Sequence, residues 1–465
     1  MVTREDALDL ASARFDDGTF LAALARRVAV PTESQEPRGA PHLADYLSHE
    51  IRPTFETLGG QFHIYDNPVA GGPPIGVGML DEDPSLPTVL VYGHGDTVRG
   101  QEGQWADGRD PWRLERAGDR IYGRGVADNK GQHSVNLAAL QTVREARGRL
   151  GFNLRFLLEM AEEVGSTGLR EFCVAQRDLL SADLLIASDG PRLETHRPTV
   201  FMGARGAFNF DLSIDLRAGG HHSGNWGGLL ANPAIRLMHA IASLVGPTGA
   251  IQVPELKPVA IPDAVRACLV GLSVDGGPDA PEIDRAWGEP GLTPAEKVFA
   301  WNTFEVLAMK AGNPDAPVNA IPPTARAHCQ MRFTVDRDPE TFLPAIQRHL
   351  AVSGFPEVVV TPAEKGYFNA TRLDPEHPAA QWAVRSVARS AGRDPAVLPN
   401  LGGSLPNDLF AQLLGMPTIW VPHSYAGCSQ HAPNEHGLAP VLREGLRIMT
   451  GLFWDLGEAP PLLAR

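Results

Sequence analysis

The sequence is poor in cysteine and contains no long apolar run. Its four cysteines are scattered without any Cys-x-x-Cys pair, which fits a reducing compartment and leaves no thiolate site for zinc. The longest apolar runs, such as residues 88–92, are far shorter than the ~20 residues that a membrane helix needs. We therefore expect no transmembrane segment, and any metal ion must be held by histidines and carboxylates.

Basic residues are also in deficit. The chain has 41 lysines and arginines against 55 aspartates and glutamates, a net charge of −14. Because such a charge repels phosphate backbones and anionic lipids, neither nucleic acid nor a membrane surface is an expected partner. Residues 1–17 interleave charged and apolar side chains and lack the continuous apolar block of a signal peptide, so we predict a cytoplasmic protein.

Apolar residues are plentiful, and their periodicity alternates between two patterns. Hydrophobic side chains make up 43% of the 465 residues, which is enough for a large core and favours two domains. The spacing predicts helices over 20–27, 43–58 and 131–147 and short buried strands over 88–92, 154–158 and 184–187. Helices that alternate with apolar strands predict an α/β domain with a mostly parallel sheet and flanking helices.

The pattern changes near residue 205 and changes back in the C-terminal hundred residues. In between, it predicts strands over 208–216, 326–335 and 358–361 and helices over 233–244 and 342–352. This is typical of a small antiparallel α+β insert, ferredoxin-like in kind. Residues 246–312 are rich in proline, glycine and aspartate, and we predict a surface region with limited regular structure there. The expected organisation is a catalytic domain of residues 1–204 and 365–465, interrupted by an insert of residues 205–364.

Two polar clusters in the first third of the chain are candidates for a site. His94 and Asp96 directly follow the predicted strand at 88–92, and alternation in an extended segment puts both side chains on one side. Asp96 can then accept a hydrogen bond from one imidazole nitrogen while the other binds a metal. Asp128 lies in a glycine-punctuated loop before a helix, where by itself it reads as a turn or N-cap residue. The glycine spacing matches neither the P-loop nor the dinucleotide fingerprint, which argues against a phosphate cradle.

Further carboxylates and a second histidine follow later strands. Glu162 and Glu163 come after the apolar strand at 154–158, and adjacent carboxylates repel one another unless a cation or a shared proton separates their roles. Asp189 follows the next buried strand, and His431 lies beyond the strand predicted near the C-terminus. Because ligands bind at the carboxyl ends of strands in such sheets, we expect these residues to share a site. Two histidines with several carboxylates suit two Zn²⁺ ions, with Mn²⁺ or Co²⁺ as alternatives.

The order and spacing of these clusters, from Tyr92 to Glu435, resemble the carnosinase-like dipeptidase branch of the co-catalytic di-zinc peptidase and deacylase superfamily. Its relatives include aminoacylase, acetylornithine deacetylase and succinyl-diaminopimelate desuccinylase. The resemblance covers nearly the whole chain. It implies a zinc exopeptidase-like catalytic domain, two Zn²⁺ ions per chain, and an inserted domain that serves in dimerisation and closes over the site as a lid.

Matched residue by residue, the resemblance implies five metal ligands, one of them shared by both ions. One zinc would be held by His94, Asp128 and Asp189, and the other by Asp128, Glu163 and His431. The resemblance also implies that Asp96 orients His94 and that Glu162 is the general base rather than a ligand.

The insert carries two further residues that match the family. His222, in a glycine-rich segment, matches the histidine that reaches across the dimer into the partner's active site and supports the developing oxyanion. The neighbouring His221 departs from the pattern and leaves open which ring does this, and the alternative is a structural histidine pair in a turn. Arg332 matches the position that clamps the substrate carboxylate, a task suited to a planar two-pronged donor. Arg326, six residues earlier on the same strand face, is a rival.

The segment that contains Gly403 and Ser404 resembles the Gly-Gly-Ser segment that lines the substrate pocket in carnosinase-like dipeptidases. An ordinary loop is the alternative, but the segment favours a dipeptidase over a deacetylase. We therefore predict a homodimeric hydrolase that cleaves the amide bond of a small carboxylate-bearing substrate. An N-acyl amino acid amidohydrolase of the same architecture is the nearest alternative. A binding protein that kept only the fold is a third, but it predicts loss of the base or the ligands, and none of them is missing.

Overall fold

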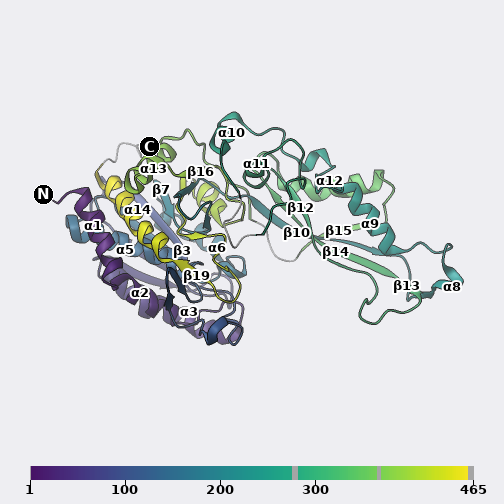
Figure 1. The fold of residues 1–465 in the computed structure, drawn as a ribbon, viewed down its shortest axis with the longest axis horizontal. Helices are drawn as coiled ribbons and strands as arrows, with labels where there is room; N and C mark the ends of the chain where they lie inside the picture. Colours follow the sequence, from purple (N-terminus) through teal and green to yellow (C-terminus); the bar gives the residue numbers. More distant parts are fainter. Residues whose placement is uncertain (1, 275–280, 364–367, 459–465) are drawn as a thin grey trace.

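Two lobes make up the molecule in the computed structural model, which describes residues 2–274, 281–363 and 368–458. Figure 1 shows a larger lobe that holds both termini and an elongated smaller lobe built from the middle of the chain. The expected boundary between residues 364 and 365 lies outside the described residues. Within the described ranges, no helix is both long and apolar enough to cross a membrane.

The larger lobe is organised by an eight-stranded sheet. In order across the sheet, its strands are β1 (Gln61–Tyr65), β2 (Ile75–Leu80), β6 (Asn153–Glu159), β3 (Thr88–His94), β7 (Leu184–Ala187), β17 (Thr418–Trp420), β9 (Thr199–Phe201) and β16 (Ala396–Leu398). The central strands β6, β3, β7 and β17 run parallel to one another, whereas β1 and β2 add an antiparallel edge. The mainly parallel sheet expected from the sequence is confirmed.

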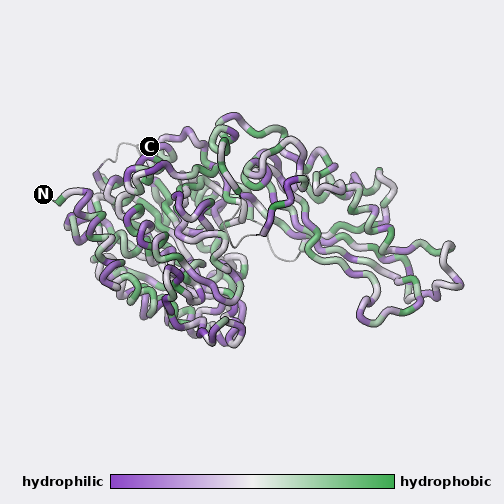
Figure 2. The backbone as a smooth tube through the Cα atoms, in the orientation of Figure 1, coloured by the Kyte–Doolittle hydropathy of each residue, from purple (hydrophilic) through white to green (hydrophobic). Residues whose placement is uncertain are grey.

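Hydrophobic side chains from both faces of this sheet are buried. In β3, Val89 and Val91 join the core on one face, while Leu90 and Tyr92 join the core on the other. The helices over the first face are α1 (Arg4–Asp16), α2 (Thr19–Val28), α5 (Lys130–Arg147), α13 (Pro378–Ala391) and α14 (Ala439–Glu458). Those over the second face are α6 (Leu169–Ala175), α10 (Asp263–Leu269) and α11 (Pro294–Phe299). Burial on both faces explains why the strands read as continuous apolar runs, and Figure 2 shows hydrophobic stretches running through the middle of this lobe.

The smaller lobe contains an antiparallel four-stranded sheet with two helices on one face. Across the sheet the strands are β12 (Thr303–Lys310), β14 (Thr324–Phe333), β10 (Gly206–Asp215) and β15 (Val359–Pro362). Helices α9 (Pro233–Leu244) and α12 (Phe342–Val352) pack against it around a separate core. The chain order β10, α9, β12, β14, α12, β15 with this strand order is that of a ferredoxin-like unit, which is the insert that the sequence predicts.

Residues 246–312 have limited regular structure, as expected, but two features differ from a plain surface region, and residues 275–280 lie outside the described ranges. Helices α10 and α11 come from this region and help to cover the second face of the large sheet. Strand β12 forms the edge of the small sheet, and six of its eight residues are exposed, Val306, Leu307 and Met309 among them. A strand exposed on both faces has no alternation of apolar and polar residues, so the pattern that reveals a half-buried strand is absent.

Candidate metal centre and substrate cavity

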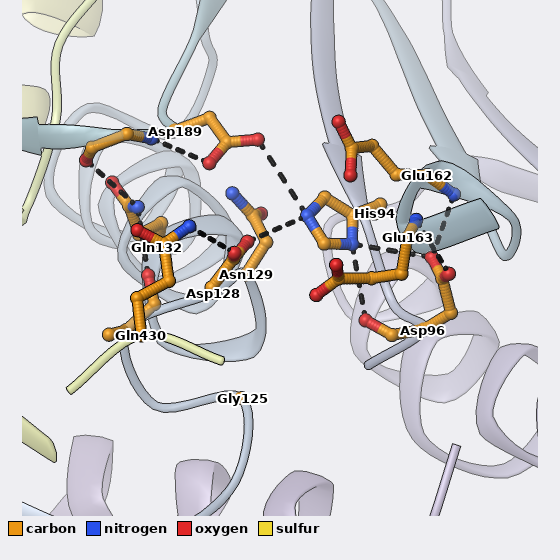
Figure 3. Close-up of polar contacts among 12 residues, drawn as sticks. His94, Asp96, Gly125, Asp128, Asn129, Gln132, Glu162, Glu163, Asp189 and Gln430 are labelled. Atoms are coloured by element: carbon orange, nitrogen blue, oxygen red, sulfur yellow. Dashed lines mark hydrogen bonds and ion pairs between the residues drawn. The ribbon is translucent and has the colours of Figure 1, made fainter. Parts of the chain in front are cut away.

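The first candidate ligand group forms at the end of β3. His94, its last residue, is fully buried, and its Nε2 lies 2.9 Å from Asp128 Oδ1 and 3.7 Å from Asp189 Oδ2. Its Nδ1 lies 3.1 Å from the backbone oxygen of Asp96 and 3.3 Å from the carboxylate of the same residue (Figure 3). Asp96 therefore occupies one ring nitrogen and leaves the other facing Asp128 and Asp189, as a metal-binding histidine requires. These three residues form one group whose ligand atoms could share an ion.

The second candidate group lies on the other side of Asp128. His431 Nε2 is 3.0 Å from Asp128 Oδ2 and 3.1 Å from Glu163 Oε2. Asp128 Oδ2 also accepts a hydrogen bond from Gln430, a residue that the sequence analysis did not single out. Because the two oxygens of Asp128 face different histidines, the carboxylate stands between the two groups in the geometry of a bridging ligand.

Asp96 also holds the loop that carries the two glutamates. Its Oδ1 accepts the backbone N–H of Glu162 at 3.2 Å, and its Oδ2 accepts that of Glu163 at 3.1 Å. This loop is a short 3₁₀ turn, η4 (Glu162–Val164), which directly follows the strand beside β3. One buried carboxylate thus sets the position of His94 and of both glutamates.

Glu435 plays the corresponding part for the loop that carries Asp128. Its carboxylate accepts the N–H groups of Gly125, Ala127 and Asp128 at 2.9–3.1 Å, and it receives Arg124 Nη1 at 2.8 Å. Glu435 and Arg124 are both about 1% exposed, so this is a buried ion pair inside a hydrogen-bond network. No role for Glu435 could be predicted from the sequence, because its partner Arg124 lies 311 residues away in the chain and leaves no local signal.

The electrostatics of the cluster fit divalent cations. Burial, followed by the charge of Asp128, raises the pKa of Glu163 to about 7 and that of Asp189 to about 6. Burial also raises the pKa of Asp128, but hydrogen bonds from His431 and His94 outweigh it and hold that pKa well below its usual range. Glu163 Oε1 is buried and has no hydrogen-bond partner among the residues that the structure describes. Closely spaced buried carboxylates with an unused lone pair and two histidine nitrogens are a donor set that suits Zn²⁺ or a similar ion.

A cavity of about 480 Å³ opens beside these residues. Asp128, Asp189 and His431 line it together with Glu162, whose pKa burial raises well above its usual value. Gly402, Gly403 and Ser404 line the same cavity. The structure thus places both members of the predicted substrate-binding loop in the same cavity as the candidate ligands and the candidate base.

Arg332 adjoins this cavity, whereas its rival does not. Arg332 Nη1 donates to Ser404 Oγ at 2.9 Å, which joins it to the cavity wall. Arg326, on the same strand, is paired with Asp211 beside a different cavity in the smaller lobe. The structure also adds Arg205, a buried residue that lines the cavity and that the sequence analysis missed. An arginine between two predicted elements gives no sequence signal of burial.

His222 is not brought to the centre within this chain. It belongs to β11 (His221–His222), which pairs with β13 (Ala320–Ile321). Figure 1 shows this part at the tip of the smaller lobe, away from the larger lobe. The ring of His221 lies edge-on to Trp226, with centroids 6.1 Å apart, while His222 is exposed. Of the two residues, His222 is the more exposed.

Comparison with known proteins agrees with this geometry. A model described as Peptidase family M20/M25/M40 matches residues 90–455. A Beta-Ala-His dipeptidase of Mus musculus is 37% identical over 188 residues, which are 40% of this chain and 38% of that protein, so the match spans about two-fifths of each. Cys-Gly metallodipeptidase DUG1 of Saccharomyces cerevisiae is 29% identical over 472 residues, covering 95% of this chain and 96% of that protein. The crystal structure of human carnosine dipeptidase 1 superposes with a TM-score of 0.78 at 21% identity over 98% of this chain and 99% of that chain, which shows a shared fold.

Proposed function

Since the chain belongs to peptidase family M20/M25/M40, we propose that it is a metal-dependent dipeptidase that hydrolyses the amide bond of a small carboxylate-bearing substrate. The observation that carries this proposal is the position of Asp128 between two histidines, in a cavity that also contains Glu162 and the loop of Gly403 and Ser404. Relatives named as dipeptidases favour this activity over that of an N-acyl amino acid amidohydrolase.

Two divalent ions, taken to be Zn²⁺ with Mn²⁺ or Co²⁺ as alternatives, would occupy the two ligand groups. His94, Asp128 and Asp189 would hold one, and Asp128, Glu163 and His431 the other. When bound, such ions supply Lewis-acid chemistry, which polarises an amide carbonyl and makes water more acidic. Asp96 would keep His94 in its ligating orientation through the contact to Nδ1.

Glu162 is the residue that we assign to proton transfer. It lines the cavity next to the ligands and has no ion-pair partner among the described residues. As the general base, its carboxylate takes a proton from the attacking water, and it then gives that proton to the nitrogen of the leaving amine. The hydrogen bond from its backbone N–H to Asp96 fixes the position of the main chain from which the Glu162 side chain extends.

The carboxylate of the substrate is assigned to Arg332 and its hydroxyl partner Ser404. A guanidinium can clamp a carboxylate through two parallel hydrogen bonds. Arg332 already donates to Ser404 Oγ, so the guanidinium is held at the cavity wall before substrate binds. Gly403, without a side chain, lets the substrate backbone approach the same wall.

The assembly that we propose is a homodimer. Residues 205–364 would form the dimerisation and lid domain, and residues 1–204 and 365–465 the catalytic domain. His222 would then reach the partner subunit's site and support the carbonyl oxygen as negative charge develops there. Its exposure, on a strand that pairs with β13 at the tip of the smaller lobe, supports a role between chains. The proposed location is the cytoplasm.

A hydrolysis screen tests the proposal. Protein stripped with a chelator and reloaded with Zn²⁺ or Mn²⁺ is offered dipeptides and N-acyl amino acids, and release of amino acid is measured. We expect turnover of dipeptides that depends on metal and is abolished in Glu162→Gln. Turnover of N-acyl amino acids alone would favour the amidohydrolase instead.

A further inference from the structure

Arg205 is a buried arginine placed where the two lobes meet. It lies between β9 and β10, is 7% exposed, and lines the cavity that holds the candidate metal ligands. Its Nε donates to Gly402 O at 2.9 Å and its Nη1 to Trp301 O at 3.3 Å. Among the described residues, its Nη2 has no hydrogen-bond partner. The guanidinium is thus held from one side and keeps a free donor.

Arg205 and Arg332 belong to one network. Ser404 Oγ accepts from Arg332 Nη1 at 2.9 Å and donates to the backbone oxygen of Arg205 at 2.7 Å. Arg205 directly precedes β10, in which Ala207 pairs with Arg332. Ser404 thus joins the guanidinium of Arg332 to the main chain of Arg205, whose own guanidinium is bonded to Gly402 in the same loop.

Neither guanidinium has an acidic partner within 4.0 Å in the described part of the chain, unlike the buried Arg124 and Arg192. The buried Arg27 lacks one there as well, but its two terminal nitrogens donate to the hydroxyls of Ser134 and Thr54. Arg124 is paired with Glu435 at 2.8 Å and Arg192 with Glu444 at 2.5 Å. Burial, followed by the charge of Arg332, lowers the pKa of Arg205 to about 9. Buried charges are costly unless they are paired, so an anion from outside the chain is the natural partner.

Glu305 is an acid whose charge acts on Arg205. It lies two residues after Thr303, which pairs with Arg332, and so shares a face of the small sheet with Arg332. Glu305 lines a neighbouring cavity together with Arg205. Its negative charge offsets part of the cost of burying the Arg205 charge, but the two side chains do not form an ion pair. The single carboxylate of Glu305 cannot neutralise both Arg205 and Arg332, so positive charge remains in excess around Ser404.

We propose that this cavity binds a carboxyl-terminal residue with two carboxylates, so that the preferred substrates are dipeptides that end in glutamate or aspartate. Arg332 holds the α-carboxylate, and the free Nη2 of Arg205 holds the side-chain carboxylate, which is one or two methylene groups away from the α-carbon. The inference rests on the proposed dipeptidase function for its substrate, but the paired arginines recognise the anion whether or not it is cleaved.

A matched pair of substrates tests the proposal. Ala-Glu and Ala-Gln have nearly the same shape and differ in one charge, so their kcat/KM ratio isolates recognition of the second carboxylate. We expect the metal-loaded enzyme to favour Ala-Glu by about tenfold or more, because a neutral amide leaves a buried charge unpaired. In Arg205→Gln the ratio should fall to about one, while Arg205→Lys, which keeps the charge, retains part of it. Arg326→Gln, a charge loss on the same sheet away from the cavity, serves as the control and keeps the full ratio.

Two results would overturn the inference. A ratio near one in the unaltered enzyme means that Arg205 does not recognise a second carboxylate. An equal loss on both substrates in Arg205→Gln, with the ratio unchanged, means that Arg205 only positions the loop of Gly402. Calorimetric binding of free glutamate and glutamine to the metal-loaded protein separates the two proposals. Glutamate binding that requires Arg205, without any dipeptide turnover, would refute the dipeptidase function and retain the anion site. Dipeptide turnover without any preference for glutamate would refute the anion site and retain the dipeptidase function.

Discussion

Replacing Glu435 with glutamine removes a charge that no proposed step of the reaction uses. Two groups of donors converge on its carboxylate: Ala127 and Asp128 N–H on Oε1, and Arg124 Nη1 on Oε2, with Gly125 N–H reaching both oxygens. The glutamine amide has one oxygen and one NH₂ group. In either orientation, the NH₂ group faces donors that it cannot satisfy.

The size of the effect follows from these contacts. The less costly orientation keeps the oxygen toward Arg124, and it still leaves two loop N–H groups unsatisfied at about 1–3 kcal/mol each. Either orientation leaves the Arg124 charge buried without an anion, and Nε and Nη2 of Arg124 have no hydrogen-bond partner within the described ranges of the chain. Breaking a buried ion pair on one side costs about 3–5 kcal/mol, so we expect the free energy of unfolding to fall by about that amount. Because the same contacts position Asp128, we also expect metal affinity to fall by about 10–100-fold.

Urea unfolding of the metal-free protein and calorimetric zinc titration measure the two effects separately. Asp455→Asn is the matched control, because Asp455 is a buried carboxylate bound by Arg4 at 2.8 Å in the packing of α1 against α14. It should lose stability and keep its zinc affinity. Adding Arg124→Met to Glu435→Gln should recover part of the stability, since the unpaired charge is then gone. A loss below about 1 kcal/mol with unchanged zinc affinity would refute the reasoning, because the network would then not hold the Asp128 loop.

Four further predictions concern the proposed mechanism. If Asp128 bridges two ions, elemental analysis of dialysed protein should find close to two divalent ions per chain, and one ion with full activity would contradict a two-metal site. Glu162→Gln should abolish turnover with metal content largely intact, whereas Glu163→Gln should lower the metal content of the protein. Equal loss of metal in both variants, measured by the same elemental analysis, would contradict this division of roles. Mixing inactive Glu162→Gln chains with inactive His222→Ala chains should restore part of the activity, because one site of each heterodimer has both residues; no recovery despite proven subunit exchange would place His222 outside the partner's site. Arg332→Ala and amidation of the substrate's carboxyl terminus should each lower kcat/KM by a factor that corresponds to about 2–5 kcal/mol, and the two losses should not add when the changes are combined, since both remove the same contact. Additive losses would show that the guanidinium and the carboxylate do not meet.

Much of the fold was readable from local patterns. The strands at 88–92, 154–158 and 184–187 are apolar on both faces, and in the structure they are neighbours at the centre of the large sheet, covered by helices on both sides. The ferredoxin-like insert was readable because β14 alternates between buried and more exposed residues along its whole length, and β10 does so over its last four residues. Strand β12 was missed because it is exposed on both faces, so burial imposes no period on its sequence.

The members of the candidate metal centre could also be named from sequence, because a parallel sheet brings the carboxyl ends of its strands to one edge. Residue type and strand position therefore selected His94, Glu163 and Asp189 before their distances were known. What the sequence could not show is which atoms meet: that the two oxygens of Asp128 face opposite histidines is a result of side-chain orientation in the folded chain.

The supporting residues were decided by tertiary structure alone. Glu435 reaches the Asp128 loop across more than 300 residues of chain, and Arg205 becomes a buried cation only because the two lobes close around it. His222 also matches a family motif, but it is exposed on β11, which pairs with β13 at the tip of the smaller lobe. Sequence periodicity records whether a residue faces a core within its own element. Burial of a charge and its choice of partner depend on segments that are distant in the chain, and only the folded chain brings those together.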